Sequence, residues 1–454
     1  MTEIINPSIL SGFMELLPED QVLFDRIKDS IEDRFQLYGF WPLDTPAIEK
    51  NEILFAKGGG ETTKQIYRIE KGENSQEQSL RFDLTVPLAR YVAQHSSELS
   101  FPFRRYQIAK VYRGERSQKG RYREFYQCDI DIVGRDRLDI RNDAEIPSVI
   151  YDIFRSLNLG GVTIHVNNRR LLNGYFSLLA IEDPVNVLRS IDKLAKIGRE
   201  KVADLLTDYG VKEDQQEELF RFLREEEDNR ALISRLESTV ESYRTEEGQM
   251  ETPAFLQFKE GVEDLVTVYK LMQEFGVPES AIKLDLSITR GLDYYTGTVF
   301  ESFLVGHEEI GSVCSGGRYD DLASNFTKEK LPGIGVSIGL TRLFYQLTQA
   351  GLLETDKGDY ITALVIPMSD EDLSYSIGLL NDLRSAGVRS QIYLEEGKMK
   401  KRFTYADQLG ARYALIIGES ERSGSALTIK DLKKGEQKTM PREEGLAFLK
   451  EARA

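Results

Sequence analysis

The segment from Arg104 to Val133 constrains the fold most strongly, because it has the pattern of two strands joined by a polar loop. The loop, Gly114 to Gly120, has glycine at both ends and polar residues between, which is typical of a hairpin. Side chains alternate between the faces of a strand with period two. In the second arm this alternation predicts a largely apolar face for the core, made of Tyr122, Glu124, Tyr126, Cys128, Ile130 and Ile132.

The opposite face of the second arm carries an unusual order of side chains: Arg121, Arg123, Phe125, Gln127, Asp129 and Asp131. Guanidinium groups bind phosphate oxygens bidentately, an aromatic ring can stack on a base, and a carboxylate suits an amine. At roughly 3.3 Å per residue this face is long enough for a nucleotide fragment beside a small molecule. The pattern also fits a solvated strand face of mixed charge, and spacing alone leaves both interpretations open.

The length and composition indicate a multidomain protein of the cytoplasm. A chain of 454 residues exceeds one ordinary core, which predicts two or three domains. The sequence shows no apolar run approaching the roughly 20 residues that span a bilayer and no signal-peptide pattern at its start, so no membrane partner is expected. Cys128 and Cys314 fit no disulfide framework or metal site, which favours a reducing compartment. The three histidines are scattered, so we assign no metal to protein side chains.

The charge distribution is uneven. The net charge of −16 argues against indiscriminate binding of nucleic acid. Between Arg104 and Phe125, however, eight basic residues stand against two acidic ones. This electropositive island is expected to attract a polyanion.

The first hundred residues contain a predicted helix, a possible interface segment and a further pair of candidate binding residues. A helix is predicted over Pro18 to Tyr38, and the proline-containing segment Phe40 to Pro46 is expected at a domain boundary or an interface. A strand from Ser79 is predicted to run into a helix at Pro87, with two polar side chains, Asp83 and Thr85, on one face. These could hold an amino group; equally, Thr85 could cap the helix while Asp83 pairs with an arginine.

Later segments suggest how the chain is divided. Residues 184–260 have helical spacing and predict a helical insertion, and a helix from Val262 to Phe275 leads back to the core. Arg290 to Glu301 combines an arginine, glycines and two tyrosines, and residues 315–320 are interpreted as a second glycine-rich turn. Residues 333–343 predict a strand entering a helix, with Arg342 in its first turn and glycines that let a nucleotide approach the backbone.

The end of the chain, residues 358–454, alternates strands and helices and predicts a small α/β domain. Its basic cluster, Lys398 to Arg402, fits either a contact with a phosphate backbone or a solvated helix start.

Taken together, these motifs resemble those of the histidyl-tRNA synthetases, a family of class II aminoacyl-tRNA synthetases. The resemblance extends from end to end and rests on five segments: Phe40 to Ile48, Arg81 to Pro87, Gly120 to Asp129, Arg290 to Gly297 and Gly335 to Leu343. It implies an α+β fold with an antiparallel sheet flanked by helices, a helical insertion and a C-terminal α/β anticodon-binding domain. The implied domains are a catalytic core in two parts (1–183 and 261–350), the insertion (184–260) and the anticodon-binding domain (358–454).

The resemblance also implies the reaction and the partners. Histidine would attack the α-phosphate of ATP to give histidyl-adenylate and pyrophosphate, and the histidyl group would pass to the 3′ end of the histidine tRNA. Mg²⁺ would accompany ATP and offset its charge. The chain would form a homodimer, with the Pro46 segment near the interface.

Residue roles follow from the same resemblance. Histidine would be held by Asp83, Thr85, Gln127, Asp131, Arg290, Tyr294 and Tyr295. ATP would be held by Arg113, Glu115, Arg121, Arg123, Phe125 and Arg342, with Phe125 stacking on adenine. The catalytic residues would be Arg113 on the α-phosphate and Arg290, which would stabilise the charge of the transition state. Gln118 would reach the acceptor end of the tRNA.

Two other functions compete with this one. A non-catalytic paralogue of the family regulates ATP phosphoribosyltransferase in histidine biosynthesis; such proteins usually lack the C-terminal domain and parts of the Arg290 signature, and both are intact here. A different carboxylate-activating ligase on the same sheet would not explain the tyrosine pair.

Overall fold

The structure is a computed structural model that describes residues 5–56, 61–70, 77–116, 120–224, 228–246, 252–289, 295–353 and 360–452. The chain divides into two compact units, one of Met1–Glu15 with Arg26–Leu353 and one of Leu16–Asp25 with Glu354–Ala454. Helix α1 (Pro18–Leu37) matches the predicted helix, and Ile27, Ile31 and Phe35 of its apolar stripe are buried.

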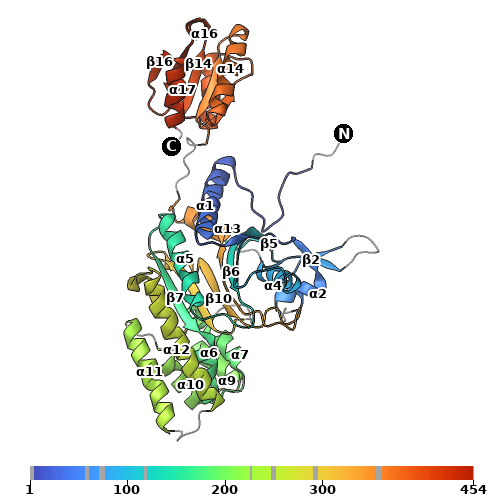
Figure 1. Cartoon of the computed structure of the whole chain (residues 1–454), viewed down its shortest axis with the longest axis vertical. Helices are drawn as coiled ribbons and strands as arrows, with labels where there is room; N and C mark the ends of the chain where they lie inside the picture. Colours follow the sequence, from blue (N-terminus) through green and yellow to red (C-terminus); the bar gives the residue numbers. More distant parts are fainter. Residues whose placement is uncertain are drawn as a thin grey trace. The chain divides into compact units, whose positions relative to one another are not determined.

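The first unit is built on an eight-stranded sheet in the order β1-β5-β6-β11-β10-β9-β7-β8 (Figure 1). The strands are β1 (Trp41–Pro42), β5 (Phe103–Tyr112), β6 (Glu124–Val133), β7 (Val162–Asn168), β8 (Ile282–Leu284), β9 (Thr298–Leu304), β10 (Cys314–Tyr319) and β11 (Gly333–Gly339). Neighbours from β5 to β7 are antiparallel, and the two edge strands run parallel to their neighbours. The predicted hairpin is therefore confirmed as β5 and β6.

Two local predictions for this sheet need revision. Residues 315–320 do not form a turn, since most of them belong to strand β10. The predicted helix at Pro87 is α4 (Thr85–Gln94), which begins at Thr85, and the strand before it is β4 (Gln78–Leu80) in a small sheet with β2 (Ile48–Lys50) and β3 (Arg68–Ile69). Two short helices complete this region: α2 (Asn51–Leu54) and α3 (Glu61–Lys64).

Helices flank the large sheet: α5 (Asn142–Ser156), α6 (Arg169–Leu178), α12 (Pro253–Glu274) and α13 (Leu340–Gln349). Helices α6 and α12 cross at two glycines, where a Cβ would lie 2.3 Å from the backbone of Phe258 if added to Gly174, and 2.2 Å from Leu171 if added to Gly261. Only glycine permits such close packing of two helices. Short 3-10 helices occur at η1 (Glu279–Ala281) and η2 (Glu308–Ile310).

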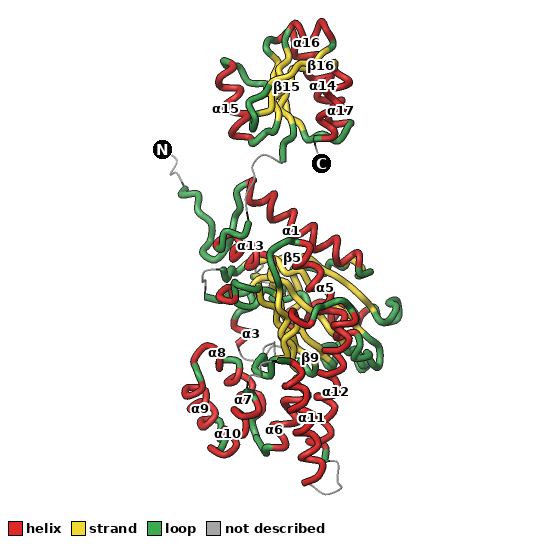
Figure 2. Tube along the Cα trace, turned by 90° about the vertical axis from the view of Figure 1, so that its left-hand side faces the viewer, coloured by secondary structure: helices red, strands yellow, loops and turns green. Residues whose placement is uncertain are grey.

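The described part of residues 184–260 contains helices and no strand, namely α7 (Pro184–Ile191), α8 (Leu194–Ile197), α9 (Arg199–Asp208), α10 (Glu213–Phe222), α11 (Asn229–Glu246) and the start of α12 (Figure 2). The ring of Phe222 on α10 stacks on Tyr175 of α6, with centroids 3.6 Å apart. The predicted start at Val262 is wrong, since α12 begins at Pro253. The domain boundaries themselves stay predictions.

The second unit contains a five-stranded sheet in the order β13-β12-β14-β15-β16, with β13, β12 and β14 parallel and the rest antiparallel. Its elements are β12 (Ala363–Pro367), η4 (Asp370–Asp372), α14 (Leu373–Ser385), β13 (Ser390–Ile392), α15 (Met399–Leu409), β14 (Tyr413–Ile417), α16 (Glu419–Gly424), β15 (Ala426–Asp431), β16 (Gln437–Pro441) and α17 (Arg442–Glu451). The predicted alternation of strand and helix is confirmed. Among the described helices of the whole chain, none is long and apolar enough to cross a membrane.

Candidate functional site

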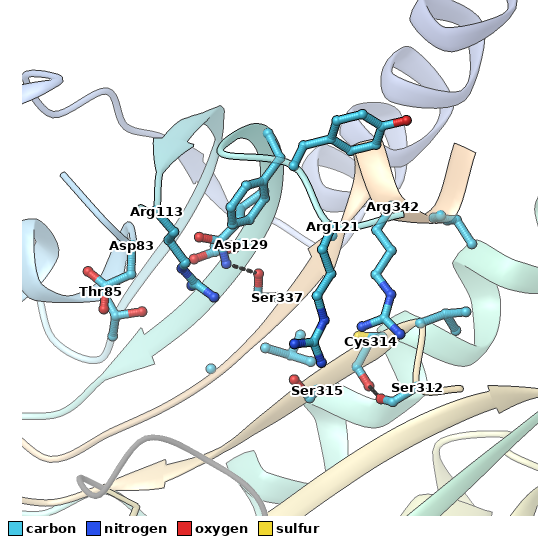
Figure 3. Close-up of a pocket in the computed structure, with 18 of the residues that line it drawn as sticks. Asp83, Thr85, Arg113, Arg121, Asp129, Ser312, Cys314, Ser315, Ser337 and Arg342 are labelled. Atoms are coloured by element: carbon cyan, nitrogen blue, oxygen red, sulfur yellow. Dashed lines mark hydrogen bonds between the residues drawn. The ribbon is translucent and has the colours of Figure 1, made fainter. Parts of the chain in front are cut away.

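A cavity of about 360 Å³ lies over the large sheet (Figure 3). Strand β6 forms part of its wall through Phe125, Gln127, Asp129 and Asp131, which share one face as the alternation predicts. The opposite side chains Cys128, Ile130 and Ile132 are wholly buried in the core. Strand β6 thus separates a packed face from a polar face that is open to a ligand.

The registers of β5, β6 and β11 set the neighbours of these polar side chains. Asp131 lies opposite Arg105 on β5 and Gly335 on β11, while Asp129 lies opposite Gln107 and Ser337. A Cβ on Gly335 would come within 2.0 Å of Asp131 Oδ1. Gly335 is therefore needed to make room for the carboxylate.

Asp131 has partners on both oxygens. The Tyr319 hydroxyl donates to Oδ1 at 2.8 Å, and the Arg105 guanidinium lies 2.6 Å from Oδ2. Burial raises the pKa of Asp131, although Arg105 and Tyr319 lower it in part. This side chain is held firmly at the floor of the cavity.

Two other carboxylates at this end of the cavity are buried and less well paired. Asp83 Oδ1 accepts from the backbone N–H of Val86 at 3.1 Å, while within the described ranges its Oδ2 and Asp129 Oδ1 have no hydrogen-bond partner. Burial raises the pKa of Asp83 to about 6 and that of Asp129 to about 7. A cluster of carboxylates with raised pKa values in a cavity favours a cationic ligand, because the ligand would supply the missing positive charge.

The position of Thr85 decides between the two interpretations of its segment. The N-cap residue of α4 is Leu84, and no side chain caps the helix at that position. The predicted cap by Thr85 is therefore wrong, and Asp83 supplies the hydrogen bond to the first turn. Thr85 lines the cavity beside Asp83.

The other end of the cavity is basic. In Figure 3, Arg121 and Arg342 lie on the side opposite Asp83 and Thr85. Arg342 comes from the first turn of α13, as predicted, and Arg121 precedes β6 with half of its side chain exposed. Glu115 lines the wall and lies 3.8 Å from Arg121.

Arg113 connects the two ends of the cavity. Its Nε donates to the Phe82 carbonyl at 2.9 Å, which fixes the side chain beside Asp83. Its guanidinium lies 5.1 Å from the centroid of the Phe125 ring. A fixed guanidinium next to an aromatic face, between acidic and basic regions, suits a phosphate that joins an amine-bearing group to a base.

Arg123 does not line the cavity, although the predicted alternation placed it on that face. Its guanidinium donates to the backbone carbonyls of Glu115 at 3.1 Å and Ser11 at 3.2 Å. Strand β6 begins at Glu124, so the period of two does not extend to residues 121–123. For the same reason Tyr122, predicted for the apolar face, lines the cavity instead.

The electropositive island is weaker than its composition suggests. Four of its cations form ion pairs with described residues: Arg104 with Glu145 at 2.7 Å, Arg105 with Asp131 at 2.6 Å, Lys110 with Glu124 at 2.7 Å and Arg121 with Glu115 at 3.8 Å. The positive charge available to a polyanion is therefore smaller than the number of basic residues suggests.

The remaining predicted site residues divide into two groups. Tyr295 lines the cavity, whereas Arg290, Tyr294 and Gln118 lie outside the described residues. Cys128 and Cys314 are buried free thiols. Within the described ranges, no group of three or more His, Cys, Asp or Glu side chains is arranged to hold a metal ion.

Several lining residues were not predicted from the sequence. They include Asp129, which lay on the predicted face without a role of its own, and Ser312, Cys314, Ser315, Tyr319, Ser337 and Gln346. Arg105 was also missed. Tyr319 and Ser337 lie in glycine-rich strands. That pattern could have indicated them, because glycines leave space beside larger polar side chains.

Comparisons with known proteins agree over the whole chain. The histidyl-tRNA synthetase family model matches residues 12–343, and that of the anticodon binding domain matches residues 362–452. Histidine–tRNA ligase of Clostridium tetani is 50% identical over 99% of this chain and 99% of its own length. The corresponding protein of Finegoldia magna is 48% identical over 98% of this chain and all of its own.

Solved structures give the same result. The crystal structure of histidyl-tRNA synthetase from Nostoc sp. PCC 7120 has a TM-score of 0.89 and 38% identity, covering 99% of this chain and 100% of that one. An ATP phosphoribosyltransferase regulatory subunit/histidyl-tRNA synthetase from Bacillus halodurans C has a TM-score of 0.70 at 19% identity, covering 89% of this chain and 97% of that one, and therefore shows only the shared fold. The α+β fold expected from the resemblance is confirmed. The chain belongs to the histidyl-tRNA synthetase family.

Proposed function

We infer that the protein is a histidine–tRNA ligase. It activates histidine with ATP to histidyl-adenylate and pyrophosphate, and then transfers the histidyl group to the 3′ end of the histidine tRNA. The observation that carries this function is the full-length similarity to curated histidine–tRNA ligases at up to 50% identity. A cavity that is acidic at one end and basic at the other supports it.

We assign the acidic end to histidine. Asp83, Thr85 and Gln127 receive its amino group, and Asp131, Tyr294 and Tyr295 receive the imidazole. The partners of Asp131 support a positioning task, because Arg105 and Tyr319 hold its carboxylate in one orientation.

We assign the basic end to ATP. Phe125 stacks on adenine, Arg113 binds the α-phosphate, and Arg121, Arg123, Glu115 and Arg342 serve the rest of the nucleotide. The placement of Arg123 against Ser11 and Glu115 means that it reaches ATP only through a change of side-chain conformation. Mg²⁺ enters with ATP as part of the substrate, where it offsets the charge of the phosphates.

The chemistry needs positioning and electrostatics rather than a covalent enzyme intermediate. The carboxylate of histidine attacks the α-phosphorus, and pyrophosphate leaves along the opposite direction. Arg113, anchored on the Phe82 carbonyl, and Arg290 stabilise the negative charge that develops on the phosphate oxygens. Because anchored groups need little reorganisation during the reaction, their electrostatic effect is available in the transition state.

The remaining assignments concern the macromolecular partners. The second unit binds the histidine tRNA, which its anticodon-binding family match supports, and Gln118 contacts the acceptor end. Lys398 to Arg402, at the start of α15, supplies phosphate contacts. The chain forms a homodimer through the segment around Pro46, beside the exposed edge strand β1, and it works in the cytoplasm, where thiols such as Cys128 and Cys314 stay reduced.

The decisive experiment is ATP–pyrophosphate exchange on the purified protein with each of the twenty amino acids in turn. Exchange with histidine alone establishes adenylation and its specificity, and charging of a histidine tRNA transcript then tests the second step. Binding of histidine without exchange would contradict the catalytic function and favour the regulatory one.

A further inference from the structure

The starting observation is a set of three hydrogen-bond acceptors that lack donors. Asp83 Oδ2, Gln127 Oε1 and Asp129 Oδ1 are buried and have no hydrogen-bond partner among the residues that the structure describes. All three side chains line the cavity, and each is less than a tenth exposed. Buried polar atoms without partners are rare in native proteins, and in a cavity they indicate where a ligand supplies the donors.

Asp129 is the unexpected member of this set. Its neighbour on β5 is Gln107, whose amide already donates to Asp44 at 3.0 Å and Thr45 at 3.2 Å. The Ser337 hydroxyl on the other side also accepts from the amide of Gln127 at 2.6 Å. The amide N–H donors of Gln107 and Gln127 are thus engaged elsewhere and leave Asp129 Oδ1 open.

Asp131, the carboxylate assigned to histidine, provides a direct contrast two residues along the same strand face. Both of its oxygens have protein partners, Arg105 and Tyr319. An incoming N–H group therefore finds an open oxygen on Asp129 and an occupied pair on Asp131.

The charges of this end of the cavity point to the same ligand. Asp83, Asp129 and Asp131 are each 2% exposed, and Arg105 is the guanidinium buried among them, with Arg113 near Asp83. Three carboxylates exceed these two cations in number, since Arg81, which also interacts with Asp129, is paired with Asp44 at 3.7 Å. A buried surplus of negative charge is costly unless a cation joins it.

An ammonium group has three N–H donors and one positive charge, which matches three open acceptors and a surplus of carboxylate. We propose that Asp129, together with Asp83 and Gln127, binds the α-ammonium group of the amino acid substrate, so that Asp129 is a determinant of substrate affinity. This inference rests on the proposed activation of histidine and adds a residue to it.

The protonation of the empty site is consistent with this role. The pKa of Asp129 is raised to about 7, mainly by burial and also by Asp131 and Asp83, while Arg105 and the Ser337 hydroxyl oppose the rise. The other ionisable groups that interact with Asp129 are Arg81 and the buried thiols of Cys128 and Cys314, whose pKa values are raised by burial. Near neutral pH part of the empty protein holds a proton on Asp129, and an arriving ammonium displaces it.

The direct test uses Asp129→Asn, which keeps the size of the side chain and removes its charge. We expect the KM for histidine in pyrophosphate exchange to rise roughly 10- to 100-fold, as for a lost charge-assisted hydrogen bond. The KM for ATP should stay unchanged. The matched control is Asp264→Asn, which alters a partly buried aspartate paired with Arg170 outside the cavity and should leave both KM values unchanged.

A measurement on the unaltered protein decides the matter if the variant does not fold. The affinities for histidine and for imidazole propionate, which lacks the amino group, are compared by calorimetry between pH 6.5 and pH 8. Ionisation of Asp129 should make the preference for histidine grow as pH rises through about 7, once each affinity is corrected for the separately measured titration of that ligand's imidazole. Equal affinity for the two ligands across this range overturns the proposal, because open acceptors that bind the ammonium group must favour the ligand that carries it.

These experiments distinguish a failure of the proposed function from a failure of the role proposed for Asp129. If the wild-type protein shows no histidine-dependent exchange, the proposed function is wrong whatever Asp129 does. If the wild-type protein exchanges normally and Asp129→Asn leaves the KM for histidine unchanged, only the role of Asp129 is wrong.

Discussion

Two buried arginine–aspartate pairs of the first unit differ in how completely they are satisfied. Arg318 on β10 binds Asp143 on α5 through two bonds, Nε to Oδ2 at 3.0 Å and a terminal nitrogen to Oδ1 at 2.6 Å. Arg105 approaches Asp131 just as closely, at 2.6 Å, but its Nε and other terminal nitrogen have no hydrogen-bond partner in the described part of the chain.

The contrast separates a structural pair from a ligand site. The Arg318 guanidinium also donates to the Asp139 carbonyl at 3.3 Å, so its charge is matched within the protein. The Arg105 pair belongs to a set with surplus carboxylates and open acceptors, which the protein leaves for a substrate. Incomplete pairing in a buried region is tolerated where a ligand completes it.

The largest effect should come from the Arg318–Asp143 pair, the more completely hydrogen-bonded of the two. Arg318→Met leaves the wholly buried Asp143 without its cation, and breaking a buried pair in this way costs about 3 to 5 kcal/mol of the free energy of unfolding. Urea denaturation of wild type and variant measures the difference. The double variant Arg318→Met/Asp143→Leu should recover most of the loss, because both charges are gone; no recovery would contradict a purely structural pair.

The next effect concerns catalysis rather than stability. Arg113→Ala removes the guanidinium assigned to the α-phosphate, and we expect kcat for pyrophosphate exchange to fall by roughly 10²- to 10³-fold, as for the loss of one fixed transition-state donor. Single-turnover formation of the adenylate measures it. The exposed Arg141, paired with Asp139 at 2.8 Å, provides the control: Arg141→Ala should exchange normally.

A smaller effect is the pH dependence of stability that the carboxylates at the acidic end of the cavity cause. The pKa values of Asp83 and Asp129 in the folded protein, about 6 and about 7, lie above the usual value for aspartate. The folded state therefore binds these protons more tightly, and stability falls as pH rises from about 4 to 7. Relative to wild type, Asp129→Asn should gain up to about 1.4 kcal/mol for each pH unit between pH 4 and pH 7. If the free energies of unfolding of the two proteins change in parallel with pH, Asp129 is ionised throughout this range.

The smallest effect is expected at the rim of the cavity. Glu115 and Arg121 lie 3.8 Å apart, and half of the arginine side chain is exposed. Glu115→Gln should therefore change the free energy of unfolding by less than about 0.5 kcal/mol. Thermal unfolding at low and at high salt checks this value, and a large salt-sensitive loss would mean that the pair is part of the framework.

Local rules predict the parts of this site that lie within one strand. The period of two along β6 is enough to bring Phe125, Gln127, Asp129 and Asp131 to one face. It fails for Tyr122 and Arg123, because the strand does not begin until Glu124 and the side chains before it follow the loop. Sequence position alone gives no means of locating that start to the residue.

The pairing between strands could not be predicted in the same way. Whether Arg105 meets Asp131 depends on the register of β5 against β6, which the whole sheet sets. The glycine pattern of residues 315–320 suggested a turn, yet these glycines lie in a strand: a Cβ on Gly316 would come within 2.2 Å of the Gly335 carbonyl oxygen. Glycine was required by the neighbouring strand, and a single sequence does not distinguish that need from a turn.

The edge strand β1 has a further, spectroscopic consequence. The chain contains one tryptophan, Trp41, which lies on that strand opposite Arg105 and is 71% exposed. Tryptophan emission shifts to shorter wavelength when the indole leaves water. The intrinsic fluorescence of the whole protein is therefore a one-residue optical reporter of whatever covers this edge, without any label or substitution.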